Sequence, residues 1–363
     1  MEENLILCAA ADGGKSLPDS EDFAFLRDLG LIKTDGEIEK LTVAGLLFVG
    51  KQSSISRLLP SAEVIYLHYS ADNLEEYDAR LDMRQPIVSV LDRLTEIIQN
   101  DNRILNVQIG LFRLEIADFS EKVFQEALLN AMSHRDYQSM SAVYVKHYPD
   151  KIVIENPGGF LDGITEKNII THPSASRNKL IAETLQHLKY VQRTGQGVDI
   201  IYREMVSMGK PYPEYHVFSD AVSLTLRSSV EDMSFVKFVV AEQEKKQIIL
   251  SLAELMILRY VTENKQIKLS DAKDLVQLSL EDTRKCCLNL VKLGLIETVG
   301  KEYMLTARVY EMVKSDVQYT RDKVVQYIKA EQQARATIDK MRKENIIDMI
   351  GKGKSSKYVL VKS

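Results

Sequence analysis

Residues 126 to 137 read Glu-Ala-Leu-Leu-Asn-Ala-Met-Ser-His-Arg-Asp-Tyr. Glu126 and Asn130 are four residues apart, so on a helix both side chains lie on one face and can point at one ligand. A carboxylate can orient or deprotonate water, and an amide oxygen can complete a Mg²⁺ shell that is shared with phosphates. The pair therefore suits a nucleotide site, although the same spacing alone is more often the solvated edge of an amphipathic helix.

The segments around this helix alternate between strand and helix patterns. A hairpin is expected at Pro149-Asp150, between two β-branched, alternating runs. The other expected elements are a strand at 62–69, helices at 87–99, 123–133, 177–190 and 198–208, and a strand at 221–226. This order predicts an α+β fold with a mostly antiparallel sheet for the first half of the chain.

Two glycine-containing segments follow the central helix. Glu155-Asn-Pro-Gly-Gly-Phe160 comes directly after a strand, where glycines let a backbone approach a flat ligand and an acid or amide could read an adenine amino group. Thr194-Gly-Gln-Gly197 opens a helix, where backbone N–H groups and the helix dipole favour phosphate. Each segment also has an ordinary reading, as a tight turn and as a plain helix start.

Taken in this order, the three segments are similar to the Bergerat-type ATP site of the GHKL superfamily, which includes gyrase B, MutL and the histidine kinases. The narrower resemblance is to the divergent GHKL domain of bacterial regulators labelled RecG-like helicase-related or Schlafen AlbA-domain transcriptional regulators. It rests on Glu126–Tyr137, Asn156-Pro-Gly-Gly159, Ser176-Arg-Asn178 and Gly195-Gln-Gly197, and covers residues 20 to 228. The resemblance implies a Bergerat-like α/β sandwich with bound ATP and Mg²⁺.

The same resemblance implies a role for each matched residue. Glu126 corresponds to the catalytic or water-orienting acid, and Asn130 corresponds to the Mg²⁺ ligand. The implied nucleotide-binding residues are Asn130, His134, Arg135, Glu155, Asn156, Gly158, Gly159, Arg177, Asn178, Gly195 and Gly197, with Glu155 or Asn156 at the adenine-reading position. The superfamily's Asp-x-Gly-x-Gly is replaced here by Glu155-Asn-Pro-Gly-Gly. We expect at most slow ATP hydrolysis.

Two other motifs are weaker. Ala9-Ala-Ala-Asp-Gly-Gly-Lys-Ser16 fits a relaxed P-loop pattern, but Pro18 and the acidic residues after it interrupt the helix that a P-loop must open. His134 and Asp136 have a spacing that does not place them on one helix face, so a catalytic pair is not expected. We interpret that segment as a helix terminus whose His134 or Arg135 touches the ligand rim.

After residue 242 the pattern changes to short helices that end in small hairpins. Helices at 252–263, 270–276 and 280–293 precede a hairpin at 300–305, which is the order of a winged helix-turn-helix. A second such unit is expected over 313–363. The resulting domains are an N-terminal segment at 1–60, a linker left after a missing AlbA-type domain, then the GHKL-type domain at 61–228 and tandem winged helices at 243–312 and 313–363.

The charge of the chain restricts contacts with DNA to particular regions. The whole chain of 363 residues carries a net charge of -5, so it has no general attraction to nucleic acid or to anionic membranes. Residues 340 to 363 are locally basic, with seven Lys or Arg against two Asp or Glu. The expected DNA-binding residues are Arg284, Lys285, Lys292, Lys352, Lys354 and Lys357.

Cysteine content and hydrophobicity place the protein in a reducing compartment. Cys8, Cys286 and Cys287 are too few and too badly spaced for a disulfide framework or a zinc cluster. The longest apolar runs fall far short of the ~20 residues that span a bilayer, and no signal peptide is recognisable. We therefore expect a cytoplasmic protein without membrane contact.

These observations predict an ATP-binding, DNA-binding transcriptional regulator in which nucleotide changes the DNA-binding or dimeric state. The lack of a convincing P-loop argues against a helicase motor. A homodimer is expected. The alternatives that remain open are a non-catalytic dimerisation scaffold with a degenerate nucleotide site, and a nucleic-acid-dependent ATPase.

Overall fold

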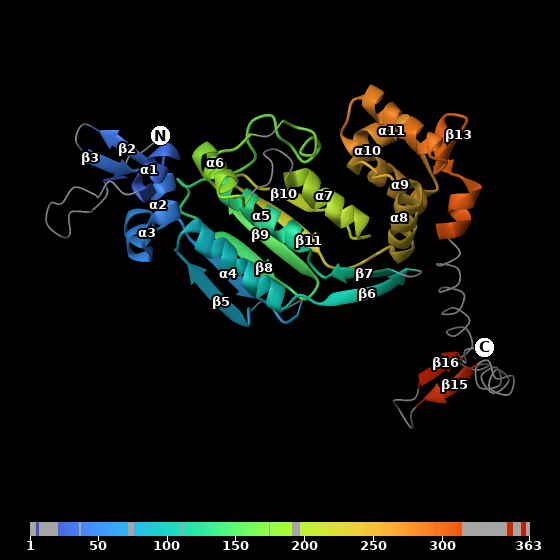
Figure 1. Cartoon of the computed structure of the whole chain (residues 1–363), viewed down its shortest axis with the longest axis horizontal. Helices are drawn as coiled ribbons and strands as arrows, with labels where there is room; N and C mark the ends of the chain where they lie inside the picture. Colours follow the sequence, from blue (N-terminus) through green and yellow to red (C-terminus); the bar gives the residue numbers. More distant parts are fainter. Residues whose placement is uncertain are drawn as a thin grey trace. The chain divides into compact units, whose positions relative to one another are not determined.

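A computed structural model describes residues 5–6, 21–35, 38–71, 76–109, 112–173, 175–190, 197–313, 347–350 and 357–360. The chain divides into two compact units, Met1–Leu305 and Thr306–Ser363. Figure 1 shows the elements and their labels. The candidate site lies in the first unit.

A six-stranded sheet forms the centre of the first unit. Its order is β10-β11-β9-β8-β4-β5, and its strands are β4 (Val64–His68), β5 (Ala79–Met83), β8 (Val143–His147), β9 (Lys151–Pro157), β10 (Glu214–Val217) and β11 (Ala221–Arg227). Only β4 and β8 run parallel among these neighbours. The predicted α+β class and the mostly antiparallel sheet are thereby confirmed.

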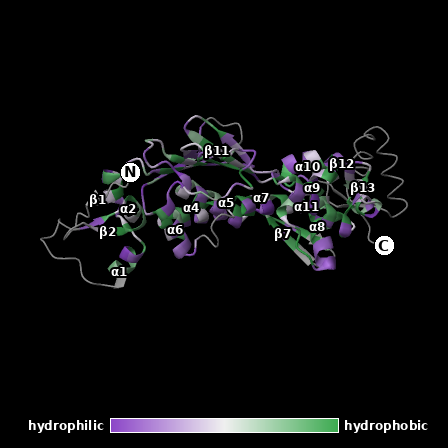
Figure 2. Cartoon of the chain, turned by 90° about the horizontal axis from the view of Figure 1, so that it is seen from above, coloured by the Kyte–Doolittle hydropathy of each residue, from purple (hydrophilic) through white to green (hydrophobic). Residues whose placement is uncertain are grey.

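Helices cover one face of this sheet (Figure 1). They are α4 (Ile87–Asn100), α5 (Glu121–His134), α6 (Lys179–His187) and α7 (Gly197–Ser207). Strand alternation sends Val64 and Tyr66 of β4 into the cluster beneath the helices, whereas Ile65 and Leu67 belong to a cluster on the opposite face. The helices carry both hydrophobic and hydrophilic residues (Figure 2), because each has only one buried side.

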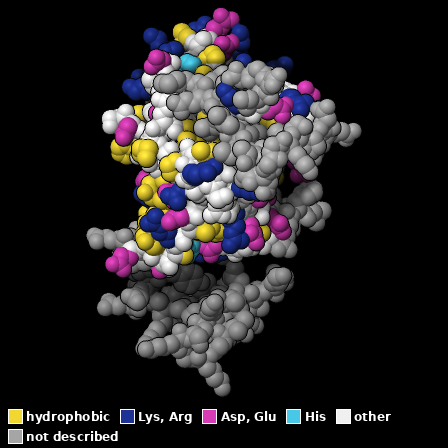
Figure 3. Space-filling view, turned by 90° about the vertical axis from the view of Figure 1, so that its left-hand side faces the viewer, with side chains coloured by type: hydrophobic (Ala, Val, Ile, Leu, Met, Phe, Trp, Pro, Cys, Tyr) yellow, Lys and Arg dark blue, Asp and Glu magenta, His cyan; other side chains and the backbone are white. Residues whose placement is uncertain are grey.

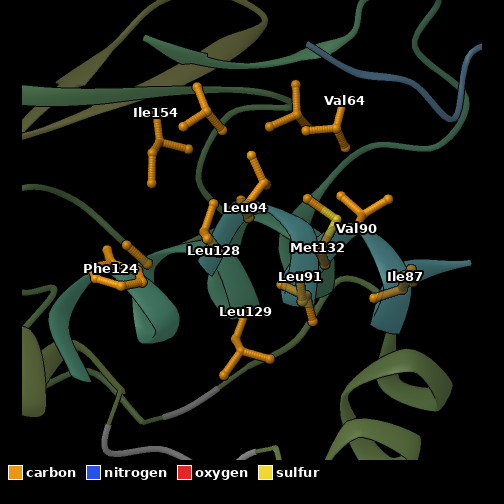
Figure 4. Packing of buried hydrophobic residues seen from close by; sticks show 14 of the residues in the cluster. Val64, Ile87, Val90, Leu91, Leu94, Phe124, Leu128, Leu129, Met132 and Ile154 are labelled. Carbon is orange, nitrogen blue, oxygen red and sulfur yellow. The ribbon is translucent and has the colours of Figure 1, made fainter. Parts of the chain in front are cut away.

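The main core lies between α4, α5 and the sheet (Figure 4). Leu94 and Leu128 are fully buried there, beneath the strand residues Val64 and Ile154. Truncating such a leucine to alanine costs about 2–5 kcal/mol of stability. The core therefore holds α5, with Glu126 and Asn130, firmly against the sheet.

Residues 21–60, which the sequence leads us to expect as a linker, form packed structure. The elements are α1 (Glu21–Asp28), β2 (Ile32–Asp35), β3 (Ile38–Leu41), α2 (Val43–Val49) and α3 (Gln52–Leu58), and β1 (Leu5–Ile6) pairs with β3. Leu46 and Ile55 are buried in the main core. The apolar run of α2 makes this segment part of the fold.

In Figure 3 basic, acidic and apolar side chains are interspersed over the described part of the visible face.

A hairpin and a helix are among the elements that were not predicted from the sequence. Strands β6 (Ile104–Ile109) and β7 (Phe112–Ala117) form a separate antiparallel hairpin between α4 and α5. Helix α8 (Met233–Lys246) fills the stretch that reads as a change of composition, and Asp232 caps it by accepting a hydrogen bond from the Phe235 backbone N–H at 2.8 Å.

The rest of the first unit follows the expected order. Its elements are α9 (Leu252–Asn264), β12 (Gln266–Lys268), α10 (Leu269–Val276), α11 (Leu280–Lys292), β13 (Ile296–Val299) and β14 (Glu302–Leu305). The strands form a small sheet of order β12-β14-β13, in which β12 is an addition to the expected hairpin. Ser251 and Glu254 form a capping box at the start of α9.

In the second unit the structure describes only a short helical turn after Thr306 and the antiparallel strands β15 (Ile347–Ile350) and β16 (Lys357–Leu360). The helices expected for the second winged unit fall within residues 314–346, which lie outside the described residues. Lys352 and Lys354 also lie outside them, and Lys357 begins β16. Within the described ranges, every helix is too short or too polar to cross a membrane.

Candidate functional site: a cavity beside the central helix

A cavity of about 210 Å³ opens between α5, α7, the ends of β9 and β11, and the loop that follows β9. By this measure one water molecule needs only about 10–15 Å³, so the cavity can admit a ligand much larger than water. Its lining includes Glu126, Asn130, His134, Asn156, Gly158, Gly159, Arg177 and Gly197 from the residues predicted above. Three sequence segments that are far apart along the chain therefore meet at one place.

Glu126 and Asn130 project from α5 into the cavity, beside the first residue of α7. A Cβ added to Gly197 would overlap the Glu126 carboxylate, lying 2.9 Å from Glu126 Cδ and 3.1 Å from Asn130 Nδ2. Glycine at this position thus lets the two helices approach around the polar pair. Burial raises the pKa of Glu126, which makes its carboxylate a better proton acceptor than an exposed one.

The side chains of Asn156 and Glu155 point to opposite faces of the sheet, because consecutive residues of a strand alternate between its two faces. Glu155 forms an ion pair with Lys146 at 2.6 Å, whereas Asn156 is buried and lines the cavity. Asn156 Oδ1 has no hydrogen-bond partner within the part of the chain that the structure describes. Since buried polar atoms are nearly always paired, this oxygen is an acceptor available to a ligand donor.

Arg177 ties the rim of the cavity together. Its Nε donates to the His134 carbonyl at 3.1 Å and its Nη2 donates to the Gly159 carbonyl at 2.7 Å. Among the ion pairs that the described residues form, none includes Arg177, so its positive charge has no carboxylate neighbour to neutralise it. Burial and the charge of Arg177 together lower the pKa of His134 and keep its imidazole neutral at pH 7.

The turn after β9 depends on glycine. Gly158 has φ +96°, a left-handed conformation that side chains rarely adopt, and a Cβ there would lie 2.9 Å from Asp136 Cβ. The Asp136 backbone N–H donates to the Pro157 carbonyl at 2.8 Å. This contact joins the end of β9 to the residues after α5. Gly159, in contrast, borders open space.

Arg135 and Asn178 are placed as structural anchors. Arg135 is 1% exposed, and its guanidinium donates to the carbonyls of Ser61, Glu63 and Ser141. Asn178 Nδ2 donates to the carbonyls of Ser133 and Arg135 at the end of α5. Both side chains therefore hold the backbone around the cavity. The neighbouring His134, by contrast, lines the cavity.

Some cavity residues were not singled out from the sequence. Asp199 lies in the first turn of α7, and burial raises its pKa while Arg203 opposes the shift. Tyr215 and Phe160 form a tilted aromatic pair with ring centroids 6.1 Å apart. The acid two residues after Gly197 was the signal available for Asp199. The aromatic pair had no local signal, because Phe160 and Tyr215 lie far apart in the sequence. Gly195 lies outside the described residues.

The structure describes no group of three or more His, Cys, Asp or Glu side chains that could hold a metal ion by itself. Any metal in this cavity would therefore need ligand oxygens from another source, such as phosphates or water. Asn130 and Glu126 supply the oxygens of the kind that Mg²⁺ prefers.

Comparisons with known proteins give family matches for two parts of the first unit. Residues 141–226 match the family model described as "Putative ATP-dependent DNA helicase recG C-terminal", and residues 7–65 match a domain of unknown function (DUF8451). The first match includes Asn156, Arg177 and Gly197, whereas Glu126 and Asn130 precede it. No curated protein matches the chain.

A solved structure shares the fold. The crystal structure of the DIP2311 protein from Corynebacterium diphtheriae superposes with a TM-score of 0.67 at 20% identity, covering 82% of this chain and 60% of that one. This chain thus spans about three fifths of that protein's length. Ligand-free NadR matches with a TM-score of 0.18 and 14% identity, over 31% of this chain and 83% of that one, and supports no argument about the fold. Residues 141–226 therefore lie in an ATPase-like domain of mixed α+β architecture, which is similar to the RecG C-terminal family model.

Proposed function

We propose that the cavity binds ATP with Mg²⁺ and that the chain is a DNA-binding transcriptional regulator whose DNA-binding or dimeric state responds to the nucleotide. The observation that carries the nucleotide part is the meeting of Glu126, Asn130 and Gly197 with the unpaired acceptor of Asn156 in one cavity. The ATPase-like family match over 141–226 supports the same conclusion.

Asn156 fits a purine base. Its amide offers one acceptor and two donors, so Oδ1 can accept from the adenine amino group while Nδ2 donates to a ring nitrogen. The buried Oδ1 without a protein partner is the atom that such a base would satisfy. Ile154 and Leu224 also line the cavity and provide apolar contact for a flat ring.

The other polar residues suit the phosphate end. Asn130 would hold Mg²⁺, which when bound neutralises phosphate charge. Glu126, with its raised pKa, would accept a proton from the attacking water. Arg177, at the rim without a carboxylate partner among the described residues, would meet phosphate oxygens. Turnover would be slow at most.

We assign the DNA-binding role to winged helices at the C-terminal side. The order α9-β12-α10-α11-β13-β14 supports the first of them, with α11 as its recognition helix. Arg284 and Lys292 are exposed on α11, whereas Lys285 pairs with Glu281 at 3.2 Å and Asp282 at 3.0 Å. Arg284 and Lys292 are therefore the better phosphate contacts on this helix, and the basic residues Lys352, Lys354 and Lys357 would add contacts from the second unit.

The test uses Glu126→Ala and Asn130→Ala in the full chain. We expect Mg-ATP to raise the melting temperature of the wild type, since a ligand that binds the native state stabilises it. Both variants should weaken that shift and change ATP-dependent DNA retention in a gel-shift assay. If affinity, turnover and DNA binding are all unaltered in both variants, the proposal is wrong.

The alternatives differ in the same experiment. A non-catalytic scaffold would show no thermal shift with Mg-ATP in the wild type. An autonomous nucleic-acid-dependent ATPase would release phosphate rapidly when DNA or RNA is added. The replacement of the superfamily's adenine-reading acid by Asn156 is the feature that favours the scaffold.

A further inference from the structure

The loop that forms one wall of the cavity is attached to the turn between α10 and α11. We call residues 160–173 the lid loop; its Ile164, Ile169 and Ile170 line the cavity. In Figure 1 the loop preceding α6 reaches toward α10. The partner in the turn is Gln277, which is more than 100 residues away in the sequence.

Gln277 makes three hydrogen bonds to the lid loop. Its Oε1 accepts from the Ile170 backbone N–H at 3.0 Å, and its Nε2 donates to the Glu166 carbonyl at 3.1 Å. Its own backbone carbonyl accepts from Thr171 Oγ1 at 2.7 Å. One amide side chain thus bonds to both a backbone donor and a backbone acceptor of the lid loop, so these two hydrogen bonds form only when the loop has this conformation.

The backbone of Gln277 is itself unusual. It ends α10 with φ 57°, a left-handed position that glycine normally occupies at helix C-termini. Glutamine adopts this left-handed conformation less readily than glycine does. Its side chain, however, makes the contact with the lid loop that glycine could not make. Asn168 braces the lid loop internally, because its Oδ1 accepts from the Thr165 backbone N–H at 2.7 Å and its Nδ2 donates to the Gly163 carbonyl at 2.7 Å.

A second attachment fixes the other end of the same three-helix region. Arg259 of α9 donates to the Lys210 carbonyl, pairs with Glu231 at 3.0 Å, and stacks over the Tyr212 ring at 5.2 Å. Helix α9 also packs against α7, which begins at the cavity. Helices α10 and α11 pack on α9, and the Gln277 hydrogen bonds join the turn between them to the lid loop.

We propose that Gln277 is a latch through which a nucleotide in the cavity fixes the position of the α10–α11 pair. The inference rests on the proposed nucleotide site and names its regulatory output. A ligand that contacts the lid loop stabilises the latched state, and by thermodynamic reciprocity the latch strengthens ligand binding. The α10–α11 turn immediately precedes the proposed recognition helix, so occupancy of the cavity is communicated to the DNA-binding element.

The test compares Gln277→Gly with a matched control, Gln247→Gly. Gln247 also ends a helix with a left-handed backbone, φ 53°, but its Nε2 donates to Glu244 within its own helix. Both substitutions relieve the strain of a left-handed backbone at a helix end. Only Gln277→Gly also removes the side-chain hydrogen bonds to the lid loop. Calorimetric titration of the full-length wild type and both variants with Mg-ATP gives the affinities. Hydrogen exchange with and without Mg-ATP then follows residues 160–173 and 269–292.

We expect Gln277→Gly to weaken Mg-ATP affinity about three- to tenfold, from the loss of two neutral hydrogen bonds. In the wild type and in Gln247→Gly, the nucleotide should slow exchange in both the lid loop and residues 269–292. In Gln277→Gly it should slow exchange in the lid loop alone. Without nucleotide, the Ile170 amide should exchange faster in Gln277→Gly than in the control.

The outcomes separate the latch from the site. If the wild type binds Mg-ATP but Gln277→Gly has the same affinity and the same protection of residues 269–292, the latch is refuted and the nucleotide site stands. If nucleotide protects the lid loop of the wild type without affecting residues 269–292, the latch is also refuted. If the wild type binds no Mg-ATP, the proposed function fails and the latch fails with it as a nucleotide device.

Discussion

Substituting Gly197 by alanine tests the arrangement at the base of the cavity. Gly197 begins α7 without a left-handed backbone, so alanine fits its conformation and should stabilise the chain by about 0.4–1 kcal/mol through the unfolded state. The added methyl group would, however, overlap the Glu126 carboxylate. Moving that side chain off its preferred rotamer costs about 0.5–1.5 kcal/mol.

The two effects nearly cancel in the wild-type background. We expect Gly197→Ala to leave the chain between about 0.5 kcal/mol more stable and about 1 kcal/mol less stable. In a Glu126→Ala background the overlap is gone, and the same change should stabilise the chain by about 0.4–1 kcal/mol. The difference between the two backgrounds, about 0.5–1.5 kcal/mol, measures the contact itself.

Urea denaturation of the four proteins in this double-mutant cycle provides the free energies of unfolding. Slow ATP hydrolysis, if present, should fall in Gly197→Ala, because the displaced carboxylate no longer orients the water. Equal stability changes in both backgrounds would show that Glu126 does not lie against Gly197. The interpretation of this part of the cavity would then be wrong.

Three further predictions concern single residues. Arg135→Met should cost about 3 kcal/mol or more in urea denaturation, since three backbone carbonyls lose a charged donor; a loss below about 1 kcal/mol with weaker nucleotide binding would instead make Arg135 a ligand contact. Asn156→Ala should weaken purine nucleotide binding about tenfold without lowering stability, because its Oδ1 has no partner among the described residues; unchanged affinity would exclude base recognition. Burial raises the pKa of Glu126 in the folded state above its pKa in the unfolded chain. The contribution of this proton to the free energy of unfolding is therefore complete at pH values below the unfolded-state pKa, and it is lost as pH rises through the folded-state pKa. Glu126→Gln should therefore gain stability over the wild type as pH rises from about 4 to about 8, and a pH-independent difference in thermal unfolding would contradict this.

The sequence predicted the elements that have strong local patterns. Helix α5 and the β8–β9 hairpin lie within a few residues of the expected ranges. The strand period could also have separated Asn156 from Glu155, because Ile152 and Ile154 share the parity of Asn156 and are buried.

Long-range contacts could not be predicted in this way. Arg135 is held by carbonyls of Ser61 and Glu63, more than 70 residues earlier, and nothing in its neighbourhood indicates them. The link between Gln277 and the lid loop spans an even greater separation. The role of residues 21–60 was missed because the family resemblance suggested a linker, although the apolar run of α2 indicated a buried helix. Local patterns fix elements, whereas tertiary contacts decide which side chains reach the cavity.

Calorimetric titration of the full-length chain with Mg-ATP tests the central claim most directly. We predict saturable binding at one site per chain, and weaker binding when Mg²⁺ is chelated, because Asn130 would lose the ion that joins it to the phosphates. Folded protein that shows no binding heat and no thermal stabilisation at millimolar Mg-ATP would contradict a nucleotide site in this cavity.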